Sequence, residues 1–253
     1  MKNALIILLF FCSFSAKSQL INADELYNKV VLLSDIKGNV LHTGTGFLLS
    51  SDNQYYLVTA KHVADSLKIE TSEIFFRDSS QTAIGFKLNR FFAKQIVRDF
   101  NDQSDFFILK LEPFDTSSLE ILKKSSLDIN ILVNDRKSID RNIDVLVMGY
   151  PIFDFDNFSP ITFKSYFSSA LLNIKIKDLP KPCLCYLLEN PSMEGFSGGP
   201  VFVGVKDRAS TKLSKTLIAG IVTGTTFDKT GGKFAIITPA FHLLDLVNRK
   251  NGH

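Results

Sequence analysis

The stretch EGFSGGP, residues 194–200, decides how this sequence is interpreted. Ser197 has glycines close by on both sides, so it can lie on a sharp turn with its hydroxyl exposed. Gly195 can take a backbone conformation that a side chain would block, and its N–H and that of Ser197 can then converge on one developing oxyanion. This is the local geometry of a serine nucleophile in acyl transfer. The alternative is a tight turn between two strands, because glycine-rich turns are common.

A serine nucleophile requires a base, and the sequence contains four histidines: His42, His62, His242 and His253. His62 lies in residues 57–65, LVTAKHVAD, where an apolar strand is expected to end and a short helical turn to begin. Such a junction holds an imidazole at the rim of a core. The alternative for His62 is a histidine packed at a strand end. His42 and His242 are interpreted as surface or packed side chains, and His253 is the last residue.

A carboxylate that orients the imidazole is the third group that this chemistry needs. Asp105 opens residues 105–111, DFFILKL, a nearly continuous apolar run. A carboxylate at the entrance of a buried strand needs a hydrogen-bonded partner, because an unpaired buried charge is costly, and a histidine N–H supplies one. Asp99 and Asp102 lie nearby, but neither directly precedes the strand, so they are interpreted as solvated loop charges.

The order His62, Asp105, Ser197, each in its local context, resembles the trypsin-like (chymotrypsin-fold) serine peptidases, and within them the bacterial HtrA-type and glutamyl-endopeptidase groups. The matching segments span about residues 28–245 and are 43–47 followed by 57–63, 105–111, 145–151, 195–200 and 219–224. The resemblance implies an all-β fold of two six-stranded antiparallel barrels with a C-terminal helix. It also implies a catalytic triad of His62, Asp105 and Ser197 and an oxyanion hole of Gly195 and Ser197, with no metal and no cofactor.

Two phenylalanines depart from the family pattern. Phe107 stands where a small residue is common in the aspartate strand. Phe196 stands where the digestive enzymes carry an aspartate that pairs with a newly exposed N-terminal amine. Since Phe196 cannot form that ion pair, we expect activity not to depend on a free N-terminal amine.

The resemblance places the primary specificity pocket between the residues just before Ser197 and the strand that ends near Gly224. The residues expected to contact substrate there are Ser192, Glu194, Thr223, Gly224 and Thr225. Only Glu194 is charged, so a buried basic side chain of a substrate would be left unpaired, which is strongly unfavourable. Val222 stands where glutamate-specific relatives tend to carry a histidine. The sequence therefore predicts a preference for an uncharged side chain, small or moderately apolar.

Short apolar runs rich in Val, Ile, Phe and Tyr alternate with turn residues, a pattern that predicts many strands. The expected units are a first barrel at about 28–111, a connection at about 112–141 with a short helix at 118–124, a second barrel at about 142–238 and a terminal helix at about 239–249. Thr238 is the expected N-cap of the terminal helix, and Pro239 suits its first position.

Residues 1–18 have the pattern of a signal peptide, which leaves residues 19–253 as the peptidase domain. The apolar run is shorter than the about 20 residues that span a membrane; an uncleaved anchor is the alternative. We expect an exported protein, periplasmic or secreted, that acts on proteins or peptides and has no stable membrane span. Cleavage removes Lys2 and Lys17 and no acid, so the formal charge falls from +3 to +1. A nearly neutral chain offers no electrostatic basis for binding nucleic acid.

Cleavage also removes Cys12 and leaves Cys183 and Cys185. Residues two apart in a strand share a face but lie about 7 Å apart, at the limit for a disulfide. We expect two unpaired thiols in or near a core, with a bridge as the alternative. No cluster of cysteines and histidines completes a zinc site.

An exported serine endopeptidase is the function that these patterns favour. One alternative is an α/β-hydrolase esterase, because residues 195–199 contain the nucleophile-elbow pattern. That fold needs a helix directly after the serine, whereas residues 201–203, VFV, are typical of a strand. The other alternative is a protease-fold binding or scaffold protein that does not turn over substrate.

Overall fold

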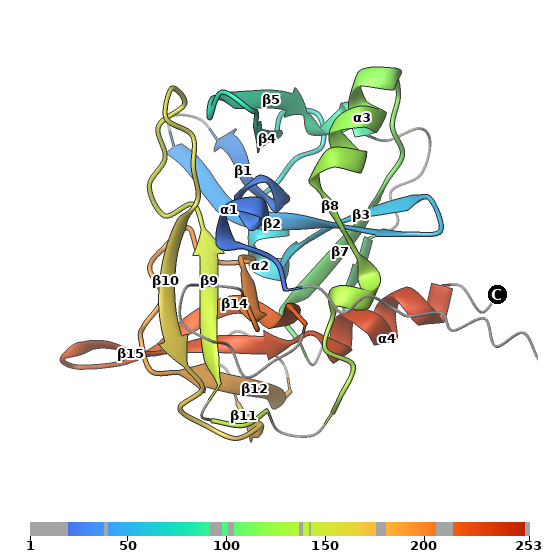
Figure 1. The fold of residues 1–253 in the computed structure, drawn as a ribbon. Helices are drawn as coiled ribbons and strands as arrows, with labels where there is room; N and C mark the ends of the chain where they lie inside the picture. The colour runs from blue at the N-terminus through green and yellow to red at the C-terminus, as the bar shows by residue number, and fades with distance from the viewer. Residues whose placement is uncertain are drawn as a thin grey trace, which may run out of the picture.

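Two antiparallel β-sheets, one above the other, form the body of the molecule, with short helices around them (Figure 1). The computed structural model describes residues 20–37, 40–91, 98–100, 104–136, 139–141, 143–175, 181–205 and 215–250. The predicted signal peptide, residues 1–18, lies outside the described residues. Within the described ranges no helix has both the length and the apolar character that crossing a membrane requires.

The first sheet is wound around β2, whose early part pairs with β1 and whose late part pairs with β3. The strand order is β5-β4-β1-β2-β3-β7-β6, all antiparallel. The strands are β1 (Val30–Lys37), β2 (Val40–Ser51), β3 (Gln54–Ala60), β4 (Glu73–Arg77), β5 (Ala83–Lys87), β6 (Arg98–Phe100) and β7 (Phe106–Leu111). A long strand shared by two partners lets the sheet turn a corner and enclose its apolar face.

The second sheet also contains a long strand shared by two partners, β14, which pairs with β13 on one side and with β15 on the other. The strand order is β10-β9-β13-β14-β15-β12-β11. The strands are β9 (Asp144–Gly149), β10 (Ile161–Tyr166), β11 (Leu172–Ile174), β12 (Cys183–Leu188), β13 (Pro200–Val203), β14 (Leu217–Asp228) and β15 (Gly231–Pro239). The predicted all-β fold of two antiparallel barrels is confirmed. Each path has a seventh strand because a three-residue edge strand, β6 or β11, extends it.

The esterase alternative is wrong, because strand β13 starts three residues after Ser197 where an α/β-hydrolase requires a helix.

The connection between the sheets contains the expected short helix, α3 (Thr116–Ser125). Asp115 caps it, accepting the backbone N–H of Ser118 while the Ser118 hydroxyl accepts the Asp115 N–H. The connection also contributes a strand that the sequence did not predict, β8 (Ser126–Asp128), which pairs in parallel with β2. Only one side chain of β8, Leu127, is buried, so its apolar signal is too weak to read from sequence.

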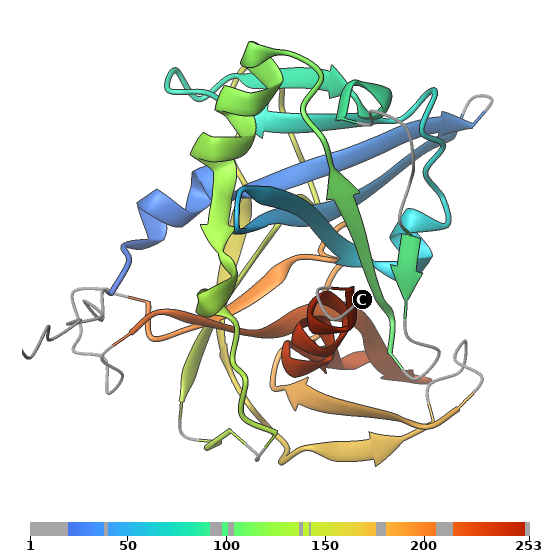
Figure 2. The same ribbon diagram turned by 90° about the vertical axis from the view of Figure 1, so that its right-hand side faces the viewer.

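The C-terminal helix is confirmed as α4 (Phe241–Lys250), but it starts later than predicted. Thr238 and Pro239 do not cap it. They complete the ladder of β15, where they lie opposite Ile221 and Gly220 of β14. Thr and Pro occur both at helix starts and at strand ends, and here pairing with β14 keeps Thr238 and Pro239 in the strand. Figure 2 shows α4 in front of the second sheet, near the lower end of β7.

The other helical segments are single turns: α1 (Ala23–Leu26), α2 (Lys61–Ala64) and the 3-10 turns η1 (Tyr27–Lys29), η2 (Leu88–Phe91) and η3 (Ile129–Ile131).

The loop between β9 and β10 joins the two sheets through backbone hydrogen bonds. The Ala83 N–H donates to Phe155 O (3.0 Å), and the Phe158 N–H donates to Gln81 O (2.7 Å). Phe158 stacks on Tyr150 with ring centroids 4.7 Å apart, and both side chains are fully buried. The loop is therefore fixed to the β4–β5 hairpin of the first sheet, and this determines where Tyr150 lies.

Candidate active site

Strand pairing between β3 and β7 brings His62 to Asp105. Ala60 lies opposite Phe106 in this ladder, so the residues just beyond them meet, and the Lys61 N–H donates to Asp105 O (3.0 Å). The Asp105 carboxylate receives the His62 backbone N–H at Oδ1 (3.1 Å), and its Oδ2 lies 2.5 Å from His62 Nδ1. The Asp105 side chain is 13% exposed and that of His62 is 50% exposed. The carboxylate is thus held on both oxygens while the imidazole reaches the surface.

The short contact to Asp105 also sets the tautomer of His62. An ionised carboxylate only accepts hydrogen bonds, so Nδ1 must carry the proton that lies between them. In the neutral ring Nε2 then has the lone pair and is the basic nitrogen. A proton taken up at Nε2 creates an imidazolium beside the carboxylate, which stabilises it.

Of the two other aspartates weighed as the acid, Asp99 lies on β6, opposite Ile108 of β7. Asp102 lies outside the described residues.

Two glycines let the loop that carries Ser197 pack closely against neighbouring backbone, Gly198 against the first sheet and Gly195 against the segment that follows β9. Gly198 has φ +85°, and a Cβ there would lie 2.1 Å from Thr45 O and 2.3 Å from Thr59 Oγ1. Gly195 has φ +89°, and a Cβ there would lie 2.6 Å from Tyr150 O. Both positions require glycine twice over, for the left-handed backbone and for the close approach of other backbone.

Hydrogen bonds from both sheets fix the backbone at Ser197. The Thr45 N–H of β2 donates to Ser197 O (2.9 Å), and the Gly198 N–H donates to Val222 O of β14 (2.8 Å). The position of a Gly198 Cβ would also be 2.9 Å from Ala60 N, two residues before His62. The serine loop and the His62 turn therefore meet at the junction of the two sheets.

The N–H groups of Gly195 and Ser197 are the two candidate donors to an oxyanion. Phe196 O accepts the Gly199 N–H (2.8 Å), so the Ser197 N–H, on the other side of the same trans peptide, points away from that bond. Within the described residues, neither the Gly195 N–H nor the Ser197 N–H donates a hydrogen bond to the protein. Both N–H groups are therefore available to an external acceptor, and their role as an oxyanion hole stays a prediction.

Phe196 is buried in the second barrel. It is 0% exposed, and its ring meets that of Phe163 edge to face at 5.1 Å. A Cβ on Gly149 would lie 2.6 Å from Phe196 Cδ1, so β9 passes directly beside the ring. Apolar packing thus orders the residue before the serine, where the digestive enzymes use an ion pair.

Three of the five predicted specificity residues lie together. Ser192 Oγ donates to Gly224 O (3.1 Å) and lies 2.6 Å from Thr225 Oγ1. Thr225 Oγ1 also donates to Ser192 O (2.9 Å), which ties the loop before the serine to β14. A Cβ on Gly224 would meet only Ile236 Cδ1, at 3.8 Å, so space is open above this residue.

Within the described residues, the other two specificity residues, Thr223 and Glu194, make no side-chain hydrogen bond to this cluster. Thr223 Oγ1 donates to Ile236 O (3.3 Å) and lies 3.1 Å from Thr238 Oγ1, so its hydroxyl is bonded to β15. Glu194 is exposed. Val222 is fully buried.

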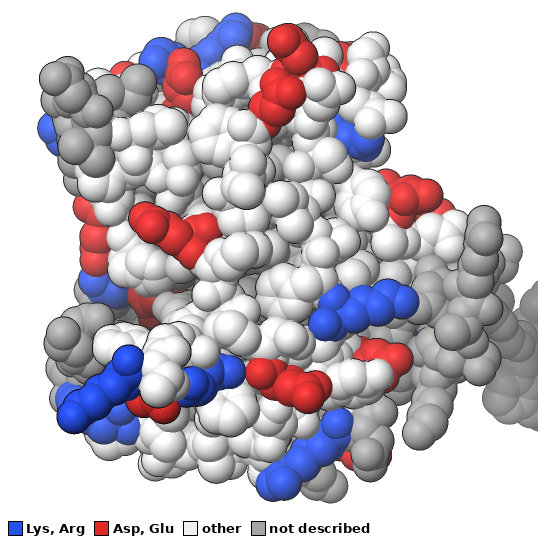
Figure 3. Space-filling model, turned by 90° about the vertical axis from the view of Figure 1, so that its left-hand side faces the viewer, with Lys and Arg blue, Asp and Glu red and all other residues white. Residues whose placement is uncertain are grey.

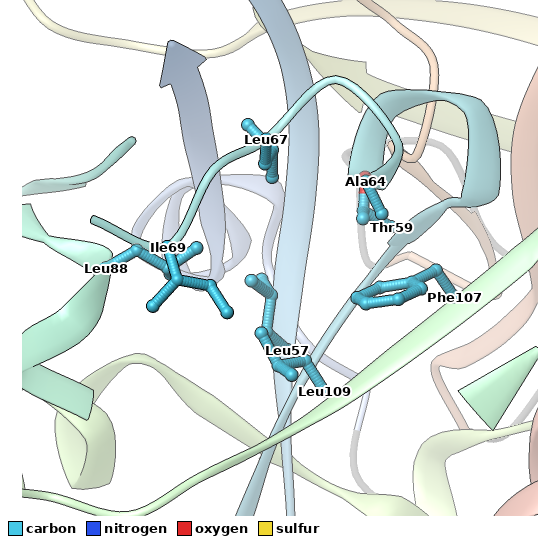
Figure 4. Close-up of a pocket in the computed structure, with 8 residues that line it drawn as sticks. All are labelled: Leu57, Thr59, Ala64, Leu67, Ile69, Leu88, Phe107 and Leu109. Carbon is cyan, nitrogen blue, oxygen red and sulfur yellow. The ribbon is translucent and has the colours of Figure 1, made fainter. Parts of the chain in front are cut away.

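Phe107 supports the turn that carries His62. It lines a small apolar pocket between β3, β7 and the segment after α2, which is shown in Figure 4. The lining residues are Leu57, Thr59, Ala64, Leu67, Ile69, Leu88, Phe107 and Leu109. The free volume is about 10 Å³, room for a single water molecule at most, so the large ring fills space that a small residue would leave empty.

The structure places the remaining candidates as follows. His42 lies on β2 opposite Asp35, and His242 is 7% exposed on α4. Cys183 and Cys185 are free and buried, as predicted, and the hydrogen bond with Cys183, together with burial, raises the pKa of the Cys185 thiol. Among the described residues, no three His, Cys, Asp or Glu side chains are grouped to hold a metal.

Sequence reasoning missed Thr45, a buried hydroxyl that contacts the serine loop. The available signal was a polar residue between two glycines in an otherwise apolar strand, but sequence does not say what that side chain faces.

A His–Asp pair on one antiparallel barrel and a glycine-rich serine loop on the next define the chymotrypsin type of peptidase fold. The family described as trypsin-like peptidase domain matches residues 44–207, and the chain belongs to this family. It is therefore a serine peptidase by family, as the sequence predicted. No curated protein matches the sequence.

Solved structures share the fold at low identity. Rv3671c from M. tuberculosis H37Rv, in its inactive form, has a TM-score of 0.53 at 18% identity, over 89% of this chain and 86% of that one. The HtrA-type protease AlgW with tripeptide gives 0.57 at 16%, over 91% and 62%. The serine endoprotease from Yersinia pestis gives 0.55 at 15%, over 89% and 65%. This chain thus spans less than two thirds of the last two proteins.

Proposed function

We propose that this chain is an exported serine endopeptidase that cleaves peptide bonds through an acyl-enzyme. The observation that carries the proposal is the Asp105 carboxylate, which receives both the backbone N–H and Nδ1 of His62. That geometry supports His62 as a general base with Nε2 as the basic nitrogen. In the proposed triad Ser197 is the nucleophile.

In the first step Ser197 Oγ attacks the scissile carbonyl carbon and its proton passes to His62 Nε2. The carbonyl oxygen becomes an oxyanion, which the N–H groups of Gly195 and Ser197 stabilise; one such donor is worth about 3–4 kcal/mol. The tetrahedral intermediate collapses, the C–N bond breaks, and His62 returns its proton to the leaving amine. Water then attacks the acyl-enzyme by the same route and releases the acid product.

Activation in this proposal needs no new N-terminal amine, because buried Phe196 replaces the carboxylate that would bind it. Enzyme carrying one or two extra residues before the mature N-terminus should keep its activity. Loss of activity on extension, with recovery after trimming, would contradict this point.

The proposed specificity is for an uncharged residue, small or moderately apolar, before the scissile bond. Ser192 and Thr225 bond to each other and offer no charge, and the space above Gly224 admits a side chain. Gly224→Val should narrow this space and lower cleavage of the larger apolar residues. Cleavage-site profiling on a peptide library tests this, and a dominant Arg or Lys would overturn it.

The proposal that the protein is exported rests on the predicted signal peptide, residues 1–18. Fractionation of the source cells and the N-terminal sequence of the mature protein test it; an intact N-terminus in the cytoplasm would contradict it.

A fluorophosphonate probe tests the catalytic proposal directly. Wild-type protein should react with one equivalent at Ser197, and Ser197→Ala should not react, although it folds. A folded wild type that does not react would instead favour the binding or scaffold alternative.

A further inference from the structure

Thr45 belongs to the first barrel, yet its hydroxyl and its N–H bind the loops of the second. It lies on β2, is 0% exposed, and follows Gly44. Its hydroxyl donates to Gly195 O (2.6 Å) and accepts the Tyr150 N–H (2.9 Å), while its own N–H donates to Ser197 O (2.9 Å). One buried residue thus holds the carbonyls on both sides of Phe196.

These bonds determine where the oxyanion donors point. The peptide between Gly195 and Phe196 is held at both ends, its C=O by Thr45 Oγ1 and its N–H by Met193 O (3.2 Å). With that plane fixed, the direction of the Gly195 N–H depends on φ and ψ of Gly195, and its φ of +89° is one that favours glycine. Tyr150 O lies where a Cβ on Gly195 would meet it, and Tyr150 is itself bonded to Thr45, so both sides of Gly195 are linked to this threonine.

We propose that Thr45 is a positioning residue for the oxyanion hole. Its hydroxyl holds the serine loop in the conformation in which the N–H groups of Gly195 and Ser197 are available, so that an N-terminal ammonium is not required. This inference rests on the proposed function, because it gives Gly195 and Ser197 the donor roles stated there.

The test compares two buried threonines of the same chemistry. Thr216 is 1% exposed, accepts the Ile21 N–H (2.8 Å) and donates to Gly204 O (2.8 Å), but it contacts neither the serine loop nor the His62 turn in these bonds. Thr45→Val and Thr216→Val each remove a hydroxyl that both donates and accepts, at nearly constant volume. Thr45→Ser keeps the hydroxyl.

The readout is the saturation kinetics of fluorophosphonate labelling, with Tm measured alongside. Both valine variants should have a lower Tm than the wild type. Only Thr45→Val should lower the maximal labelling rate, by about 10–100-fold, since removing an oxyanion donor outright costs about 10²–10³-fold. Its half-saturating probe concentration should stay unchanged, and Thr45→Ser should label at close to the wild-type rate.

Equal labelling rates for the two valine variants, or a changed half-saturating concentration with an unchanged maximal rate, would overturn the role of Thr45 while leaving the proposed function intact. A folded wild type that does not label would overturn both. Should Thr45→Val not fold, Thr45→Ala removes the same hydroxyl without a branched side chain. If neither folds while Thr45→Ser does, Thr45 serves the fold and the inference is wrong.

Discussion

The Asp105 carboxylate contacts both the backbone N–H and Nδ1 of His62, and the substitution Asp105→Asn tests the role of the contact to Nδ1. In Asp105→Asn the amide can still accept the His62 backbone N–H, but its NH₂ group donates to Nδ1 and forces the wrong tautomer. We expect the labelling rate and kcat to fall by about 10³–10⁴-fold with little loss of Tm.

Asp102→Asn is the control for that exchange and should retain near wild-type rates. A greater loss for Asp102→Asn than for Asp105→Asn would show that the acid of the triad has been wrongly chosen.

Alanine substitution at two glycines with positive φ distinguishes the cost of backbone strain from the cost of a steric clash. Gly231 has φ +112°, and a Cβ there would have nothing within 4 Å, whereas Gly198 has φ +85° and a Cβ there would lie 2.1 Å from Thr45 O. Gly231→Ala should cost only the left-handed strain, about 1–2 kcal/mol. Gly198→Ala should cost about 3 kcal/mol or more and abolish labelling, because the serine loop must move away from β2.

Urea unfolding measures both alanine variants. Equal losses of unfolding free energy would mean that the two sheets can separate at this point without cost.

At the scale of elements, His242 on α4 should make the free energy of unfolding depend on pH. Burial lowers the pKa of His242 below its ordinary value of about 6.5, with Asp245 acting in the opposite direction. The unfolded chain therefore takes up a proton at a pH where the folded chain does not. The free energy of unfolding should fall as pH drops below about 6.5, by up to about 1.4 kcal/mol per pH unit, until His242 is protonated in the folded state.

His242→Leu removes this response, and the carboxylates common to both proteins cancel in the comparison. Tm measured between pH 8 and 5 should fall more steeply for wild type than for His242→Leu. Parallel curves would contradict the neutral state of His242 in the folded protein.

At the scale of the whole molecule, the two barrels are joined by hydrogen bonds between β2 and the serine loop. Positive and negative side chains are interspersed on the face shown in Figure 3, with uncharged surface between them. The two thiols lie inside the second barrel, where Cys183 and Cys185 are 1% and 0% exposed.

The number of thiols that react before and after denaturation tests both the burial of the cysteines and the removal of the signal peptide. Native protein should not react with a thiol reagent such as Ellman's reagent, because a thiolate must be exposed to attack it. After denaturation the protein should give two thiols if the signal peptide has been removed, and three if Cys12 remains. Fast reaction of the native protein, or no reaction after denaturation without reductant, would contradict free buried cysteines.

The sequence by itself determined the features that local chemistry encodes. Alternating and continuous apolar runs identified the strands, the connection was expected to hold a short helix at 118–124, which lies inside α3, and the contexts of His62, Asp105 and Ser197 pointed to a peptidase. Their roles stay predictions, although the pairing of β3 with β7 brings His62 and Asp105 into hydrogen-bonding contact.

Only the tertiary structure decided what lies opposite each residue. Thr45 meets a loop 150 residues away in sequence, and no local pattern says that its hydroxyl binds Gly195. The same holds for Thr223, whose hydroxyl is bonded to β15 rather than to the specificity cluster, and for Pro239, which strand pairing keeps out of α4. The physical reason is common to all three: hydrogen bonds across sheets depend on register and barrel closure, which are properties of the whole chain.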